Sequence, residues 1–222
     1  MLPLSSLLLV AGAIGPLFYP EGPGKFEWRL GVGGLVDVLP RRIVQSEMRQ
    51  VPQVAVQASF GLPADFSADA RLAAIVINNQ LEVGVAWHHN VGPVAIAVQQ
   101  HLGFWVGTVG FQGFDATGWG FLFKPGLSAG VPMGSVRFTL TGEAIYTFGQ
   151  HVRLGNDTLA RRQLVFAGTG LTLTVENLLD SGRLWYFGVG VLRTLPNYQA
   201  WLAFSDERHP LSYPRFFGGY AF

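Results

Sequence analysis

Apolar and polar residues alternate along most of this chain, which is the period-two pattern of β-strands with two different faces. In the first such stretch, residues 25–38, Phe26 and Trp28 fall on one face and Glu27 on the other. The pattern recurs over residues 25–38, 53–62, 66–77, 80–88, 94–102, 117–130, 134–148, 162–175, 183–193 and 215–222. A change of phase near Gly168 to Gly170 predicts a glycine bulge. The sequence therefore predicts an all-β protein of about ten strands.

The connections between these stretches alternate in length. Short, turn-like segments lie at residues 63–65, 89–93, 131–133 and 176–181. Long segments lie at residues 40–52, 103–116, 149–161 and 194–214, with one exception at the very short link Asn78–Asn79. This alternation is typical of an antiparallel up-and-down barrel with an even number of strands. Ten strands fit, and eight or twelve stay open because residues 103–114 and 198–204 can each hold another strand.

The composition indicates that the barrel lies in a membrane. Hydrophobic residues make up 49% and charged residues 13%, against about 25% charged in soluble domains, and the mean hydropathy is +0.31. Beyond the N-terminus no uninterrupted apolar run has the roughly 18 residues of a membrane helix, and the 29 Gly and 13 Pro disfavour helices. Without helices, only a closed barrel pairs every backbone donor and acceptor in hydrocarbon. We therefore expect a transmembrane β-barrel.

The chain begins with a short apolar run that ends in Ala11-Gly12-Ala13, small residues typical of a signal-peptidase site. The basic residues that usually precede such a run are absent. We interpret residues 1–13 as a signal peptide, residues 14–24 as an N-terminal extension and residues 25–222 as the barrel. An uncleaved apolar strand or plug is the alternative.

The C-terminal stretch Arg215–Phe222 ends in Phe222, with Tyr220 two positions before it. It resembles the last strand of bacterial outer-membrane β-barrel proteins, which the barrel-assembly machinery recognises by a terminal aromatic residue and alternating apolar residues. The resemblance covers this strand and the general architecture. It implies a location in the outer membrane of a Gram-negative bacterium, with the assembly machinery and outer-membrane lipid as partners.

The faces of the predicted strands differ in chemistry. Aromatic residues such as Trp87, Trp119 and Trp185 fall on the faces assigned outward, where a membrane barrel carries aromatic girdles. The inward faces hold a nearly balanced set of charges: Lys25, Glu27, Arg29, Asp69, Arg71, Glu82, Lys124, Arg137 and Glu143. In a narrow lumen such charges pair, since an unpaired charge is costly where water is scarce. A charge-lined pore that selects solutes is the alternative.

Other chemistry finds little support in the residues. The absence of Cys excludes thiolate sites, and 15 basic against 14 acidic residues without a basic stripe argue against nucleic acid as a partner. His101, His151 and His209 fall near the long loops with several acidic residues, an arrangement similar to omptin proteases, but their Asp-x-His pair is absent. A lipid A deacylase would need His-x-Ser, which does not occur. We therefore predict no catalytic residue, cofactor or metal site.

The sequence leaves the role of the barrel open. A structural or scaffold role and small-solute, porin-like transport fit about equally well, and a lumenal binder of hydrophobic ligands or a hydrolase at the rim are the alternatives. Small inward residues such as Gly118, Gly120, Gly188 and Gly190 predict spare space in the lumen. We expect that space to hold a narrow water path or an apolar occupant, either a lipid-like molecule or residues 14–24 folded inward.

Overall fold

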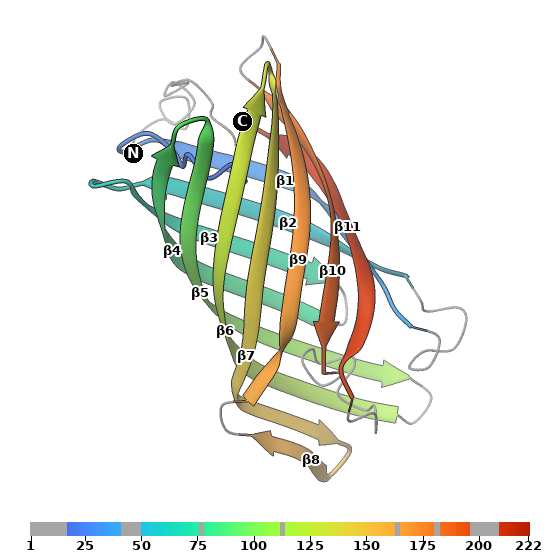
Figure 1. The fold of residues 1–222 in the computed structure, drawn as a ribbon. Coiled ribbons are helices and arrows are strands. Elements are labelled where there is room, and N and C mark those ends of the chain that lie inside the picture. The colour runs from blue at the N-terminus through green and yellow to red at the C-terminus, as the bar shows by residue number, and fades with distance from the viewer. Residues whose placement is uncertain are drawn as a thin grey trace, which may run out of the picture.

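The computed structural model describes residues 17–40, 50–75, 78–111, 114–162, 165–179, 183–195 and 209–222. Within them all regular structure is β (Figure 1). The strands are β1 (Trp28–Val38), β2 (Gln50–Gly61), β3 (Phe66–Ile75), β4 (Asn78–Val91), β5 (Val94–Phe111), β6 (Phe114–Met133), β7 (Val136–Leu154), β8 (Asp157–Arg162), β9 (Val165–Leu178), β10 (Leu184–Thr194) and β11 (Leu211–Ala221). No helix in these residues is long and apolar enough to cross a membrane.

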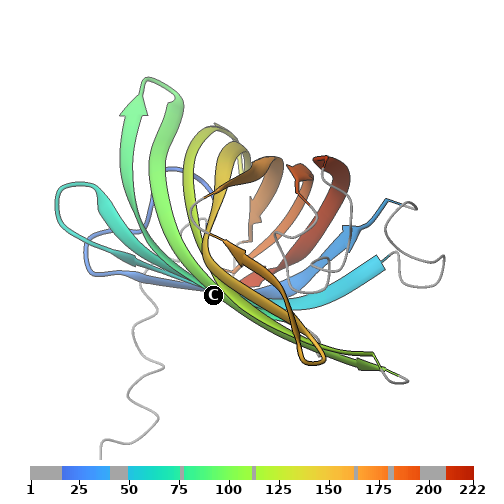
Figure 2. The same cartoon turned by 90° about the horizontal axis from the view of Figure 1, so that it is seen from below.

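Ten of these strands form a closed antiparallel barrel. Each pairs with its neighbours in the chain, β6 pairs with β7, and β1 pairs with β11 to close the ring. The strands surround a central lumen, and β8 lies outside the ring, paired only with the end of β7 (Figure 2). The predicted ten-stranded barrel is thus confirmed. We call the end with the short turns, the start of β1 and the end of β11 the turn end, and the opposite end the loop end.

Three strands are much longer than a bilayer requires. Strands β5, β6 and β7 have 18, 20 and 19 residues, whereas β1 has 11, and a tilted strand crosses a membrane with about 9 to 11. The long loops expected at residues 103–116 and 149–161 are therefore wrong. The first is the continuation of β5 and β6 into a tight hairpin, and the second is the continuation of β7 and its pairing with β8.

Two irregularities bend the long strands. Between β7 and β9 the register shifts at Ile145/Tyr146, which leaves Ala167 next to Gly168 as the extra residue, so the predicted glycine bulge is confirmed. A second shift lies opposite Trp119/Phe121, where β7 contains Gly149 with φ +62°. A positive φ at a bulge favours glycine, because a Cβ is strained there.

The outer face of the barrel is apolar. Exposed Val, Leu and Phe side chains form a band on every barrel strand, and the tryptophans assigned outward are exposed as predicted. Aromatic side chains gather at the turn end: Phe26, Trp28, Phe60, Phe66, Trp87, Trp185, Tyr220 and Phe222. A second aromatic group covers β5, β6, β7 and β9, with ring centroids 5.3 Å apart for Phe104 and Phe121 and 5.4 Å apart for Tyr146 and Phe166. Such an exterior suits hydrocarbon flanked by two interfaces.

Candidate functional site: the lumen of the barrel

The lumen at the loop end is filled by apolar side chains of the strands. This loop-end cluster consists of Leu39, Val51, Trp105, Leu122, Ile145, Val152, Ala167, Leu192 and Tyr213. Trp105 is fully buried at its centre, and a Cβ placed on Gly118 or Gly120 would meet the indole ring. The prediction of spare space at these two glycines is therefore wrong. The strand predicted at residues 94–102 extends further than expected, and Trp105 is one of its inward-facing side chains.

The lumen at the turn end is filled by a segment that precedes the first strand. We call residues Leu17–Gly24 the N-terminal plug. The ring of Phe18 packs against Tyr186 and Phe217, with centroid distances of 5.0 and 5.4 Å. Tyr19 is buried, with the guanidinium of Arg137 5.4 Å from its ring centre. Of the alternatives left open for the lumen, the structure shows the N-terminal segment folded inward from Leu17 to Pro20, while Glu21 and Gly24 are exposed and residues 14–16 lie outside the described part.

Strand side chains hold the backbone of the plug. The buried carboxylate of Glu176 on β9 accepts hydrogen bonds from the backbone N–H groups of Leu17 and Phe18, at 2.5 and 2.9 Å. On the opposite side, Nδ1 of His88 lies 2.8 Å from the carbonyl oxygen of Pro20 and therefore donates to it. Arg29 donates to the carbonyl of Gly22. These bonds satisfy polar backbone groups that the lumen shields from bulk water.

Ion pairs form a polar layer between the two fillings. The ammonium of Lys124 lies 2.7 Å from Glu82 and 3.6 Å from Glu143. The guanidinium of Arg215 forms two hydrogen bonds with the fully buried Asp37, at 2.7 and 2.9 Å. Lys124 links β6 to the non-adjacent strand β4 through Glu82, and Arg215 links β11 to β1 through Asp37, so these pairs stabilise the closed ring rather than a single hairpin.

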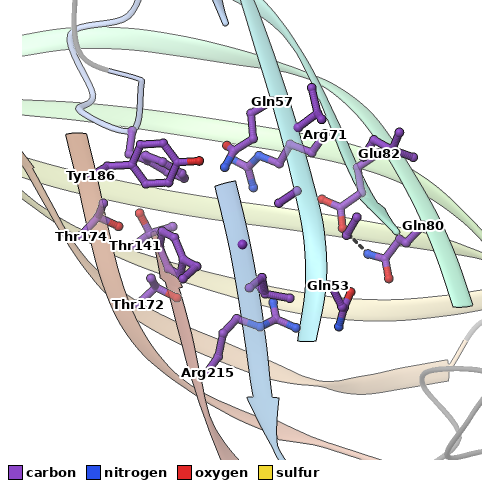
Figure 3. Close-up of a pocket in the computed structure, with 18 of the residues that line it drawn as sticks. Gln53, Gln57, Arg71, Gln80, Glu82, Thr141, Thr172, Thr174, Tyr186 and Arg215 are labelled. Carbon is purple, nitrogen blue, oxygen red and sulfur yellow. Dashed lines mark hydrogen bonds between the residues drawn. The ribbon is translucent and has the colours of Figure 1, made fainter. Parts of the chain in front are cut away.

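A cavity of about 140 Å³ lies in this polar layer. Its side toward the plug is lined by Phe18, Tyr186 and Phe217. Its other side includes Gln53, near the point where β1 and β2 continue into the loop-end cluster. Figure 3 shows its polar wall, with Gln57, Arg71 and Glu82 on successive strands and Thr141 and Thr172 across the lumen. The cavity thus has side chains of the plug on one side and of the strands leading into the loop-end cluster on the other.

The predicted charge network is distributed over three places. Arg71, Glu82, Lys124 and Glu143 line the cavity, and Arg29 and Arg137 contact the plug. The Asp69 carboxylate accepts hydrogen bonds from the hydroxyls of Ser59 and Ser67. Lys25 and Glu27 differ from the prediction: they are exposed in the turn before β1, because Phe26 has a positive φ and the strand begins only at Trp28.

Sequence reasoning missed three charged residues of the lumen. Asp37 and Arg215 are not among the charges predicted for the lumen, yet their pair crosses the seam between the first and last strands. Glu176 was placed in a connection, since the turn-like residues after it hide its position in β9. For Asp37 the signal was present, because it shares the polar phase of residues 25–38.

The described residues offer no clear catalytic or metal centre. Nε2 of His88 lies 2.9 Å from the hydroxyl of Ser67, a Ser–His contact that no sequence motif predicted, but Ser67 is 0% exposed and cannot meet a substrate. No group of His, Asp and Glu among these residues could hold a metal ion. His101 is not at the rim as expected but buried in the lumen next to Lys124, while His209 is exposed.

Comparisons with known proteins give no family. No family description matches the sequence, and no curated protein matches it. The chain is similar to the translocator domain of the autotransporter NalP from Neisseria meningitidis, with 11% identity, a TM-score of 0.44, and coverage of 88% of this chain and 86% of that chain. It is also similar to outer-membrane-expressed OmpT of Vibrio cholerae, with 9% identity, a TM-score of 0.23, and coverage of 91% and 99%. The barrel architecture described above rests on its own strand pairing.

Proposed function

We propose that this chain is an integral β-barrel of the Gram-negative outer membrane with a structural or scaffold role, and that its lumen is closed at rest. The apolar exterior of a closed barrel supports the membrane setting, because each of the ten ring strands pairs with a neighbour on both sides. The terminal Phe222 and the alternation of β11 support assembly by the barrel-assembly machinery.

The observation that carries the closed state is the double filling of the lumen. An ion or solute moving along the barrel meets the N-terminal plug at the turn end and the loop-end cluster around Trp105. The second barrier consists of apolar side chains of the barrel strands themselves, so displacing the plug alone leaves it in place. Dry apolar constrictions exclude ions because dehydrating a charge is costly.

Small-solute transport is the second candidate, because the polar layer with Arg71, Glu82 and Lys124 resembles the lining of a selective pore. A lumenal binder of purely apolar ligands has less support, since this layer is charged. Hydrolysis has less support too, because the Ser67 hydroxyl next to His88 is buried.

Conductance in planar bilayers separates the two candidates. We expect the purified full chain to give no steady ohmic current, whereas an open general porin inserted under the same conditions gives stepwise current. Stepwise conductance of the unmodified chain would contradict the closed barrel and favour transport.

Labelling of intact cells tests the location and sidedness. The chain has no cysteine, so a single introduced thiol is unique. We expect Asn156→Cys, in the exposed turn between β7 and β8, to react with a membrane-impermeant maleimide, and Ala64→Cys, in an exposed turn at the other end, to react only after lysis. The opposite pattern would invert the topology, and reaction of both in a soluble fraction would overturn the membrane assignment.

A further inference from the structure

The cavity of the polar layer has the features of a ligand site. We propose that it binds a small zwitterion, a molecule of the size of a small free amino acid, with its carboxylate at Arg71, Gln57 and Tyr186 and its ammonium at Glu143. This inference concerns the inside of the barrel and holds whether or not the barrel conducts. It is argued from hydrogen-bonding capacity, charge and volume.

Three hydrogen-bond donors converge on one side of the cavity. Gln57 of β2 and Arg71 of β3 are cross-strand neighbours, and Tyr186 reaches over from β10 (Figure 3). Within the described residues, none of these three polar ends has a hydrogen bond or an ion pair. Tyr186 is only 3% exposed, so its hydroxyl is a buried donor without a protein partner. Buried polar groups are normally satisfied, and a carboxylate accepts from all three donors.

The backbone is shaped to bring the Tyr186 hydroxyl to this place. The side chain lies across the seam of the barrel, and a Cβ on Gly33 of β1 or Gly219 of β11 would meet its hydroxyl. Glycine at both positions therefore permits the close approach. A Cβ at either position would also meet a backbone oxygen of the partner strand, so the strand pairing and the phenol both require glycine there.

An acceptor lines the same cavity on β7. Glu143 lies 3.6 Å from Lys124, but Lys124 is closer to Glu82, at 2.7 Å. Among the described residues the Glu143 carboxylate has no hydrogen bond. The hydroxyl-bearing side chain of Thr141 lines the cavity on the same strand. An ammonium group placed there gains a charge-assisted hydrogen bond to Glu143.

Charge balance selects a zwitterion over an ion. The ionised side chains of the layer are three cations and three anions: Arg71, Lys124 and Arg215 against Asp37, Glu82 and Glu143. A bound monoanion or monocation would add a net charge among these buried and half-buried ionised side chains, which is costly. A zwitterion adds no net charge, and its two ends pair with Arg71 and Glu143. The volume of about 140 Å³ is close to the roughly 150 Å³ of a cavity that holds benzene, so it admits a small amino acid.

Equilibrium dialysis with radiolabelled glycine tests the site. The full chain is refolded into detergent micelles in the presence of ligand, so that entry past the plug does not limit binding. We expect saturable glycine binding and no measurable binding of acetate or methylammonium. Arg71→Gln should weaken glycine binding by about 10- to 100-fold, and Tyr186→Phe by about 3- to 10-fold. The matched controls are Arg193→Gln and Tyr220→Phe, whose side chains are exposed on the outer surface.

The variant Glu143→Gln distinguishes a site for a zwitterion from a site for an anion. This substitution leaves the layer with one excess positive charge, so we expect glycine binding to fall at least tenfold and acetate binding to become measurable. Acetate binding as tightly as glycine to the unmodified chain would overturn the proposal. So would an absence of glycine binding, or unchanged binding in Arg71→Gln with folding verified by circular dichroism and cooperative unfolding.

Discussion

The lumen is filled in two physically different ways at its two ends. At the loop end the filling is made of apolar side chains that belong to the barrel strands, with Trp105 at the centre. At the turn end it is a separate segment, the N-terminal plug, whose backbone is bound by polar side chains such as Glu176 and His88. The first filling cannot leave without unfolding the barrel, while the second can leave and the barrel strands stay paired.

The difference shows which part of a closed barrel can respond to a signal. The loop-end cluster contributes to the free energy of unfolding through buried apolar area. The plug is governed by a local equilibrium, set by a few hydrogen bonds and by the packing of Phe18. Substitutions at the loop end should therefore change global stability, and substitutions at the turn end should change access to the lumen.

The largest expected effect is at the loop end. Trp105→Ala should lower the free energy of unfolding by about 3 to 5 kcal/mol, because it leaves a large cavity in a packed cluster. Denaturant unfolding in micelles measures this. Trp119→Ala, on the outer face of the same hairpin, is the matched control and should cost clearly less. Equal losses would mean that the cluster is not the better packed region.

Glu176→Leu should act on the plug instead. It leaves the half-buried backbone N–H groups of Leu17 and Phe18 without this acceptor, which disfavours the docked plug by about 2 to 4 kcal/mol. In a Leu17→Cys background we expect the rate of maleimide labelling to rise at least tenfold. A cysteine at Val152, in the loop-end cluster, should stay unreactive in the same variant. Labelling of both positions would show that the two ends of the lumen open together. The plug would then not move independently of the loop-end cluster.

The smallest expected effect is at His88. Replacing it with Phe removes the contact with the Ser67 hydroxyl and the hydrogen bond to the carbonyl of Pro20, and only the second, worth about 0.5 to 1.5 kcal/mol, holds the plug. Labelling of Leu17→Cys should accordingly rise only about two- to tenfold. His89→Phe is the control, because that imidazole is exposed and stacks on Trp87. An equal rise in both variants would assign the effect to the strand rather than to the bond with the plug.

The strands and their faces could be predicted because period two is a local property of the sequence. In residues 134–148 the polarity of each side chain predicts which face of the strand it lies on. The structure has β7 there, with apolar and polar side chains on the predicted faces. The lengths of β5 to β7 were missed because glycines interrupt the apolar alternation near Gly107, Gly110 and Gly118. A glycine in a short stretch of sequence predicts a turn. In the structure, however, Gly118 lies within β6 and makes room for Trp105.

The contacts of the lumen could be predicted only in part. The inward side chains Glu82 and Lys124 were expected to belong to one network, but which charge meets which depends on strand register and on the tilt of the barrel. Asp37 and Arg215 are 178 residues apart, and no local pattern pairs them. The docking of Phe18 against Tyr186 depends on the volume that the strand side chains leave inside the closed ring. That volume cannot be predicted from the linear sequence.

The seam between β1 and β11 has a consequence for the order of folding. The other barrel pairings join strands that are close in the chain, so we expect them to form early. The seam must bring the two ends of the chain together, which costs a large loop-closure entropy. Its centre pairs Gly33 with Gly219 and Gly34 with Gly218, positions without side chains to define the register. The double hydrogen bond from Arg215 to Asp37 supplies that definition. We therefore expect circularisation to be the last step, with the Asp37–Arg215 ion pair favouring closure in the observed register.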